Sequence, residues 1–128
     1  MIMSRLVRNA IRTPDGTVLE SRHVHDYKSH IDTIDGQHYM VDGGLEYSRR
    51  SVNGECMCVY LEDDHSVVRD AVTWGTYGVN GDQPISYVKV KDMVTDHIIA
   101  CLDNVPSMHK HYKEVFKNEL KFRGEHYE

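Results

Sequence analysis

Turn signals recur at short intervals through the first half of the chain, and they divide it into short segments. They are Thr13-Pro14-Asp15-Gly16, Asp35-Gly36, Asp42-Gly43-Gly44 and Asn53-Gly54. Proline presets one dihedral of a turn, glycine accepts a positive one, and Asp-Gly between alternating runs is a strong hairpin signal. We therefore expect residues 1–64 to be mainly a meander of antiparallel strands.

The runs between these turns have the length of strands. Strands are predicted over residues 5–11, 17–20, 25–31, 37–41 and 45–50. Residues 56–61 form a continuous apolar run, which favours a central position in the sheet.

Beyond Ser66 the pattern changes from alternation to helical spacing. Ser66 is a predicted N-cap, and the apolar residues that follow it indicate a short helix ending near Trp74-Gly75. Residues 85–90 return to alternation. Thr95 is expected to cap a helix over residues 96–103, and Pro106-Ser107 to begin a longer helix over residues 108–122.

Together these patterns predict an α+β fold, with an N-terminal antiparallel β-sheet followed by C-terminal α-helices. The chain has 128 residues, of which 40% are hydrophobic and 27% charged, as is typical of one soluble globular domain. We therefore predict a single domain over residues 1–128. It comprises the meander of 1–64, a short helix, glycine-rich loop and strand in 65–90, and a helical segment in 95–123.

Charge, hydropathy and cysteine content exclude several classes of partner. No run approaches the roughly 20 apolar residues needed to cross a bilayer, so we expect no membrane association and a cytoplasmic location. The net charge of -5 argues against general affinity for duplex nucleic acid, which requires a basic face. The three cysteines lack the spacing of a zinc knuckle or redox pair and are expected to be reduced.

Histidines are unusually frequent, and His23, His25 and His30 lie close to Asp26. This grouping suggests a metal site, but on a strand His23 and His25 would share a face while Asp26 and His30 point away. A structural role, in which Asp26 orients a histidine or caps a turn, is therefore favoured. The sequence contains no recognisable nucleophile, nucleotide-fold or metalloprotease motif. We accordingly predict no enzyme, no catalytic residue, no metal and no cofactor.

The glycine-rich segment 74–84 has the composition of a ligand-binding loop. Trp74 and Tyr77 supply aromatic faces, and Asn80 and Asp82 could bind ribose hydroxyls or a base edge. A structured loop without a ligand is the alternative.

A second candidate is the last helix, with cations at spacings of three and four. Lys113, Lys117, Lys121 and Arg123 could contact phosphates, or could simply form a solvated face. The pair Arg49-Arg50 could join this set, or could protect the end of an edge strand.

Several segments together carry a resemblance to a known family. They are Arg8-Asn9-Ala10-Ile11, Leu19-Glu20-Ser21, His25-Asp26-Tyr27, residues 41–50, Trp74-Gly75-Thr76-Tyr77-Gly78, Lys91-Asp92-Met93 and residues 118–123. Over most of its length the chain resembles the phage Thoeris anti-defence family, type one. Some short relatives have paired cysteines, in a zinc-ribbon arrangement, around the first two turns. This sequence has none there, so their metal is not expected.

The resemblance implies a non-enzymatic function. Family members sequester cyclic ADP-ribose isomers, such as glycocyclic ADP-ribose, that bacterial TIR proteins make, and they do not cleave them. Members are oligomers, so a homo-oligomer such as a dimer or hexamer is expected. Some also capture cyclic oligonucleotides of CBASS, a second defence system. The implied location is the cytoplasm of the infected bacterial host.

The resemblance also implies roles for particular residues. Asn80 and Asp82 match a polar Asn-x-Asp pair of the family's ligand pocket, and either Trp74 or Tyr77 represents its stacking aromatic. The basic residues of the family's last helix correspond either to Lys113 and Lys117 or to Lys117 and Lys121. Lysine lacks the planar stacking group of arginine, which weakens this correspondence. Residues expected near the phosphates are Arg49, Arg50, Lys117 and Arg123.

Two other functions remain open on the sequence. A small metal-assisted phosphodiesterase or hydrolase, using His23, His25 and Asp26, would alter its ligand and lose activity with a chelator. A module that blocks a host protein would bind no nucleotide and would co-purify with its partner.

Overall fold

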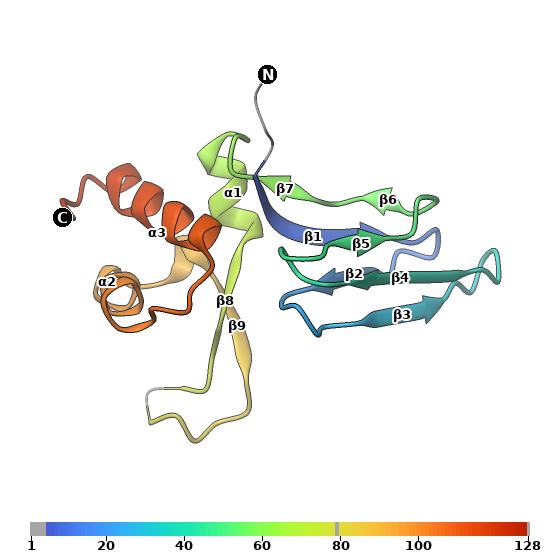
Figure 1. Cartoon of the computed structure of the whole chain (residues 1–128), viewed down its shortest axis with the longest axis horizontal. Coiled ribbons are helices and arrows are strands. Elements are labelled where there is room, and N and C mark those ends of the chain that lie inside the picture. The colour runs from blue at the N-terminus through green and yellow to red at the C-terminus, as the bar shows by residue number, and fades with distance from the viewer. Residues whose placement is uncertain (1–4, 79, 128) are drawn as a thin grey trace. The chain divides into compact units, whose positions relative to one another are not determined.

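The computed structural model in Figure 1 describes residues 5–78 and 80–127. The chain forms two compact units, Met1–Tyr60 and Leu61–Glu128. Antiparallel sheets lie mainly in the N-terminal half and helices near the C-terminus, which confirms the predicted α+β class. The single domain over residues 1–128 stays a prediction.

The first unit consists of two antiparallel sheets. The first sheet has β1 (Leu6–Arg12) at its centre, between β2 (Val18–Ser21) on one side and β6 (Glu55–Cys56) and β7 (Val59–Tyr60) on the other. The second sheet has the order β3 (Lys28–Ile31), β4 (His38–Asp42) and β5 (Arg49–Arg50). The predicted antiparallel strands are therefore present, but they are divided between two sheets, and β1 pairs with β6 and β7, which do not follow it directly in the chain.

The core of this unit lies between the two sheets. Ile11 and Leu19 from the first sheet form one buried cluster with Tyr39 and Val41 from the second. Asn9, also on β1, is fully buried, and its amide nitrogen donates to the carbonyl oxygens of Asp42 and Gly44, each at 3.0 Å. A buried amide persists only when it is hydrogen-bonded, so Asn9 fixes the turn after β4 to the first sheet.

Two predicted strands of this unit differ from those observed. Within residues 56–61 only Cys56 and Val59–Tyr60 lie in strands, and the pairing of β7 with β1 shifts register between Leu6 and Arg8. The central position belongs to β1. The strand predicted over 45–50 is reduced to Arg49–Arg50, because Gly43 and Gly44 both adopt positive φ and extend the turn. A Cβ atom on Gly44 would lie 2.7 Å from the backbone carbon of His23, so the turn after β4 could not lie against the segment after β2 as it does.

The second unit combines helices with one hairpin. In chain order it contains α1 (His65–Ala71), β8 (Thr73–Thr76), β9 (Ser86–Lys89), a 3-10 turn over Val90–Asp92, α2 (Thr95–Asn104) and α3 (Lys110–Phe122). Asp64, not Ser66, caps α1, and its carboxylate accepts the backbone N–H of Ser66 at 2.9 Å. The predicted helical end near Trp74-Gly75 was wrong, because both residues pair with β9 as part of β8.

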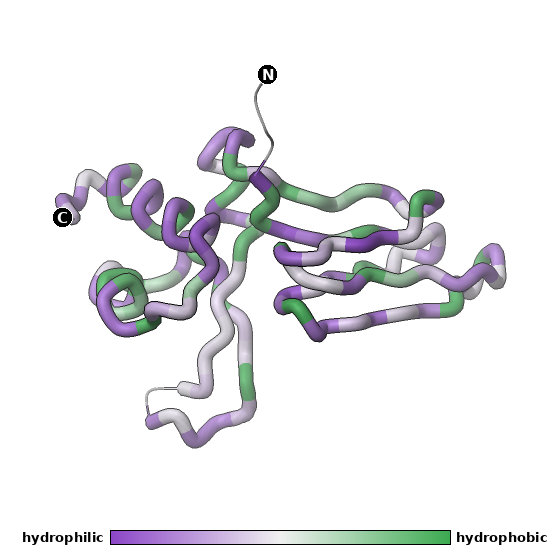
Figure 2. Tube along the Cα trace, in the orientation of Figure 1, coloured by the Kyte–Doolittle hydropathy of each residue, from purple (hydrophilic) through white to green (hydrophobic). Residues whose placement is uncertain are grey.

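Helix α3 supplies much of the core of this unit. Val115, Phe116, Glu119 and Leu120 are buried on one face, and Figure 2 shows apolar and polar residues alternating with the turns of the helix. The ring of Trp74 meets that of Phe116 edge-on at a centroid distance of 5.3 Å. No helix among the described residues has the length and apolar character needed to span a bilayer.

Helix α3 begins with an unusual cap. The Nδ1 atom of His109 accepts the backbone N–H of His111 at 3.0 Å, so this nitrogen carries no proton. We predict that His109→Ala lowers the free energy of unfolding by about 1 kcal/mol, the typical cost of losing an N-cap. His109→Asn should retain the stability, because its side-chain oxygen can accept the same bond. Urea unfolding followed by circular dichroism would measure both, and equal losses in the two variants would contradict the capping role.

Candidate functional site

The two aromatic residues predicted to stack on a ligand have different surroundings. Trp74 lies on β8, is half-buried and packs edge-on against Phe116. Tyr77 follows β8 and is 56% exposed. Of the two rings, that of Tyr77 is therefore the more accessible to a ligand.

The predicted polar pair lies in the same hairpin loop. Asn80 and Asp82 are both exposed. The backbone N–H of Gln83 donates to the carbonyl oxygen of Tyr77 at 2.9 Å, which closes the loop between β8 and β9. The loop thus presents a phenol ring and two short polar side chains to solvent.

Two of the predicted lysines line a pocket at the end of α3. This pocket has a volume of about 360 Å³ and is lined by Lys117, Asn118, Leu120, Lys121, Glu125, His126 and Tyr127. Lys113 is half-buried and is not among these residues. Of the two lysine pairs that the sequence left open, the structure brings Lys117 and Lys121 to a common pocket.

The C-terminal tail forms the other wall of this pocket. The backbone N–H of Glu125 donates to the carbonyl oxygen of Leu120 at 2.8 Å, and so turns the tail back along α3. The hydroxyl of Tyr127 donates to a carboxylate oxygen of Asp103 on α2 at 2.8 Å. This bond raises the pKa of Tyr127 and ties the tail to a second helix.

Arg123, predicted near phosphates, is engaged inside the second unit. Its Nε donates to Glu119 at 2.6 Å, Nη1 donates to the hydroxyl of Thr95 at 3.1 Å, and Nη2 donates to the carbonyl oxygen of Val90 at 3.0 Å. These bonds direct the guanidinium toward α2 and the 3-10 turn. Its assignment as a ligand residue stays a prediction.

The main acceptor for Arg123 is a buried carboxylate that the sequence analysis did not single out. Glu119 is 0% exposed, and Arg69 binds it with two bonds of 2.9 Å while His65 contacts it at 2.9 Å. Burial by itself would raise the pKa of Glu119, but the bonds from Arg69, Arg123 and His65 outweigh it and lower the pKa to about 2. The only sequence signal was one acid on the apolar face of a helix.

The predicted arginine pair lies in the first unit. Arg49 forms an ion pair with Asp42 at 2.5 Å, and Arg50 donates to the side-chain oxygen of Asn9 at 3.0 Å. Both arginines line a pocket of about 540 Å³ in that unit, together with Cys56. The hairpin and lysine residues belong to the other unit.

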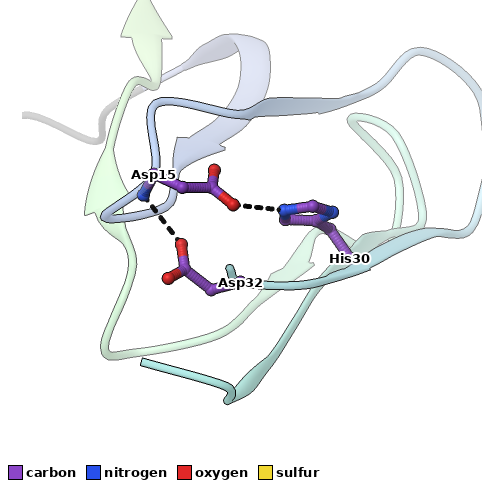
Figure 3. Close-up of side chains that lie close together, drawn as sticks. All are labelled: Asp15, His30 and Asp32. Carbon is purple, nitrogen blue, oxygen red and sulfur yellow. Dashed lines mark hydrogen bonds and ion pairs between the residues drawn. The ribbon is translucent and has the colours of Figure 1, made fainter. Parts of the chain in front are cut away.

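Figure 3 shows a cluster in the first unit that links the turn after β1 to the end of β3. Asp15, His30 and Asp32 are the only described residues that form a group of three potential metal ligands, with ligand atoms within 4.8 Å of one another. His30 contacts Asp15 through Nε2 at 2.8 Å, and the backbone N–H of Asp15 donates to Asp32 at 2.8 Å. The turn that contains Asp15 and the turn that follows Ile31 are thus held together.

Protein donors already occupy the oxygens of this cluster. One oxygen of Asp15 accepts both the N–H and the hydroxyl of Thr17, and the other accepts those of Thr33 in addition to the contact with His30. Bonds from Thr17 and His30 lower the pKa of Asp15 well below its usual range. Carboxylates saturated in this way act as structural acceptors, so we assign the cluster to stability and not to a metal.

The residues of the hydrolase alternative do not form such a group. His23 and His25 are exposed, and Asp26 accepts the backbone N–H of Arg22 at 2.7 Å and the ammonium of Lys28 at 3.3 Å. The carboxylate of Asp26 therefore stabilises a turn, as the structural interpretation of this segment predicted.

Comparison of the chain with protein-family models, with curated proteins and with solved structures found no match.

Proposed function

We propose that this protein binds a cyclic ADP-ribose isomer, such as glycocyclic ADP-ribose, and sequesters it without cleaving it. The pocket between α3 and the C-terminal tail carries this proposal. Its volume of about 360 Å³ lies in the range of small-molecule sites. Lys117 and Lys121 stand one helical turn apart at its edge, a spacing that suits the two phosphates of a pyrophosphate.

The hairpin loop supplies the complementary chemistry. The exposed ring of Tyr77 can stack on a base, and Asn80 and Asp82 can bind ribose hydroxyls or a base edge. Figure 1 shows the loop between β8 and β9 well separated from the C-terminal end of α3 within the second unit. One bound ligand would therefore contact the lysines of one copy and the hairpin of another, which requires a homo-oligomer.

Binding without turnover also agrees with the chemistry at this pocket. A sequestering protein needs cations and stacking surfaces, and it needs no activated nucleophile beside the phosphates. In the infected bacterium, sequestration of the cyclic ADP-ribose isomer would keep the defence effector inactive. Cyclic oligonucleotides of CBASS are a second class of ligand that we propose for this protein.

The test is calorimetric titration of the purified protein with TIR-generated cyclic ADP-ribose isomers. The protein is then denatured by heat, and the released ligand is analysed by mass spectrometry. Tight binding with recovery of unchanged ligand is the expected result. An altered product would instead favour a hydrolase, and absence of binding would favour a module that blocks a host protein.

We predict that the double substitution Lys117→Gln with Lys121→Gln weakens binding at least about 100-fold, because a hydrogen bond to a charged group contributes about 1.5–3 kcal/mol. Lys110→Gln removes one charge at the exposed start of the same helix and should change affinity less than about twofold. Comparable losses in the double variant and in Lys110→Gln would mean that general charge, and not this pocket, governs binding.

The shared site makes a separate prediction about mixtures. Tyr77→Ala and the double lysine variant should each bind weakly. A refolded equimolar mixture should recover about one quarter of the sites, because in these sites the lysines of a Tyr77→Ala copy meet the unmodified hairpin of a lysine-variant copy. Calorimetry gives the number of active sites. A mixture that binds no better than its components would place all contacts in one copy.

A further inference from the structure

Cys56 lines the pocket of the first unit that Arg49 and Arg50 also line. This pocket shares no residue with the lysine pocket of the proposed function. The lining residues of this pocket of about 540 Å³ are Ile11, Ser48, Arg49, Arg50, Ser51, Val52, Gly54 and Cys56. Cys56 is exposed, whereas Cys101, in the second unit, is buried. A small molecule that enters this pocket therefore meets an accessible thiol.

The charge of this pocket is positive. Arg49 is paired with Asp42, but Arg50 donates to the neutral side-chain oxygen of Asn9. A neutral acceptor satisfies the guanidinium geometrically without cancelling its charge. The pocket thus offers a cation, an accessible thiol and the volume of a small-molecule site.

The neighbouring thiol of Cys58 is less accessible. It is half-buried, donates to the carbonyl oxygen of Ala10 at 3.5 Å and is hydrogen-bonded to Cys56. Burial raises the pKa of Cys58, although the charge of Arg50 acts in the opposite direction. Exchange with a disulfide in solution should therefore begin at Cys56.

We propose that Cys56 forms a mixed disulfide with a small anionic thiol of the glutathione class, whose carboxylates bind Arg50 and Arg49. The thiolate of Cys56 attacks one sulfur of glutathione disulfide, a protein–glutathione S–S bond forms, and the original S–S bond breaks. The departing glutathione thiolate takes the proton that Cys56 lost. Glutathione disulfide is the oxidant, so no other reagent is needed.

The experiment treats the reduced full-length protein with glutathione disulfide and follows it by intact mass and peptide mapping. The Cys58→Ser variant is used, because Cys58 could otherwise displace glutathione from Cys56. We expect one glutathione per chain, attached to Cys56. Attachment mainly at Cys101, or equal modification after the further change Cys56→Ser, would overturn the proposal.

A comparison of two disulfides tests the role of the arginines. Arg50→Gln should slow the reaction with glutathione disulfide about tenfold, as expected when an attractive charge is removed, but should slow the neutral bis(2-hydroxyethyl) disulfide less than twofold. Arg5→Gln, an exposed charge outside the pocket, should slow neither. Equal slowing of both disulfides by Arg50→Gln would overturn the recognition of the anion.

Discussion

Replacing Glu119 with glutamine is expected to lower the free energy of unfolding of the second unit by about 3–5 kcal/mol. Glutamine keeps nearly the same shape but loses the charge, so Arg69 and Arg123 remain part-buried without their carboxylate. The cost is large because the carboxylate is 0% exposed, and water cannot replace it as a partner.

Trp74 is the natural probe for this measurement. It is the only tryptophan in the chain and packs against Phe116, one turn before Glu119 on α3. Urea unfolding followed by its fluorescence should show the loss in Glu119→Gln. Glu114→Gln changes an exposed carboxylate on the same helix and should stay within about 0.5 kcal/mol of the natural protein.

The same carboxylate gives the second unit a dependence on pH. The pKa of Glu119 is about 2 in the folded protein, against its ordinary value of 4.5, so the folded state holds the ionised form more tightly than the unfolded state does. Its contribution is therefore complete above about pH 5 and is lost as the pH falls toward about 2. The stability difference between the natural protein and Glu119→Gln should shrink over that interval. A constant difference would contradict the ion cluster as its cause.

The helix that carries Glu119 was predictable from the sequence, but the residues that bind the Glu119 carboxylate were not. The helix predicted over residues 108–122 agrees with α3 to within two residues at its start, and Glu119 lies on the buried face of α3 with Val115, Phe116 and Leu120. The ion cluster joins this face to Arg69, which lies 50 residues earlier in the chain. Local spacing holds no information about such a contact, because it depends on how α1 packs against α3.

In the first unit, too, local features were predictable and long-range strand pairing was not. The turns were predictable from Asp and Gly because their chemistry is local. The central strand was not, because β1 and residues 56–61 are both apolar, and only pairing decides which of them has neighbours on both sides. Trp74-Gly75 likewise follows an apolar helical pattern, but pairing with β9 outweighs it.

The sequence indicated which kinds of residue could bind the ligand, but not where in the fold they lie. Spacing on the last helix indicated a row of cations, and the family resemblance left two lysine pairs open. The pocket at Lys117 and Lys121 depends on the tail folding back. The choice between Trp74 and Tyr77 likewise depends on the contact of Trp74 with Phe116. Exposure and folding of the tail are tertiary properties, which a single sequence does not encode locally.

Asp15→Ala is expected to be the most damaging single change in the first unit. The thermal midpoint should fall by about 10 °C or more, since a small domain loses roughly 4–8 °C per kcal/mol and this carboxylate accepts several bonds. Asp15→Asn should fall between the natural protein and Asp15→Ala, because its oxygen can still accept from Thr17 while its amide nitrogen cannot accept from Thr33.

Amide hydrogen exchange gives a local measurement of the same effect. The N–H of Thr33 donates to Asp15 across the two turns, so Asp15→Ala should speed its exchange while the N–H groups of α3 keep their protection.

Chelator and added metal distinguish the hydrogen-bonded cluster from a metal site. Because protein donors saturate Asp15, a chelator should leave the thermal midpoint of the natural protein unchanged, and added Zn²⁺ should not raise it. The carboxylate of Asp32 accepts the backbone N–H of Asp15, and the carboxylate of Asp15 accepts the backbone N–H of Thr33, so both side chains join the same two turns. Asp15→Ala and Asp32→Ala together should therefore cost less than the sum of their separate effects. A midpoint that falls with chelator would show that an ion, and not the hydrogen bonds alone, holds the two turns together.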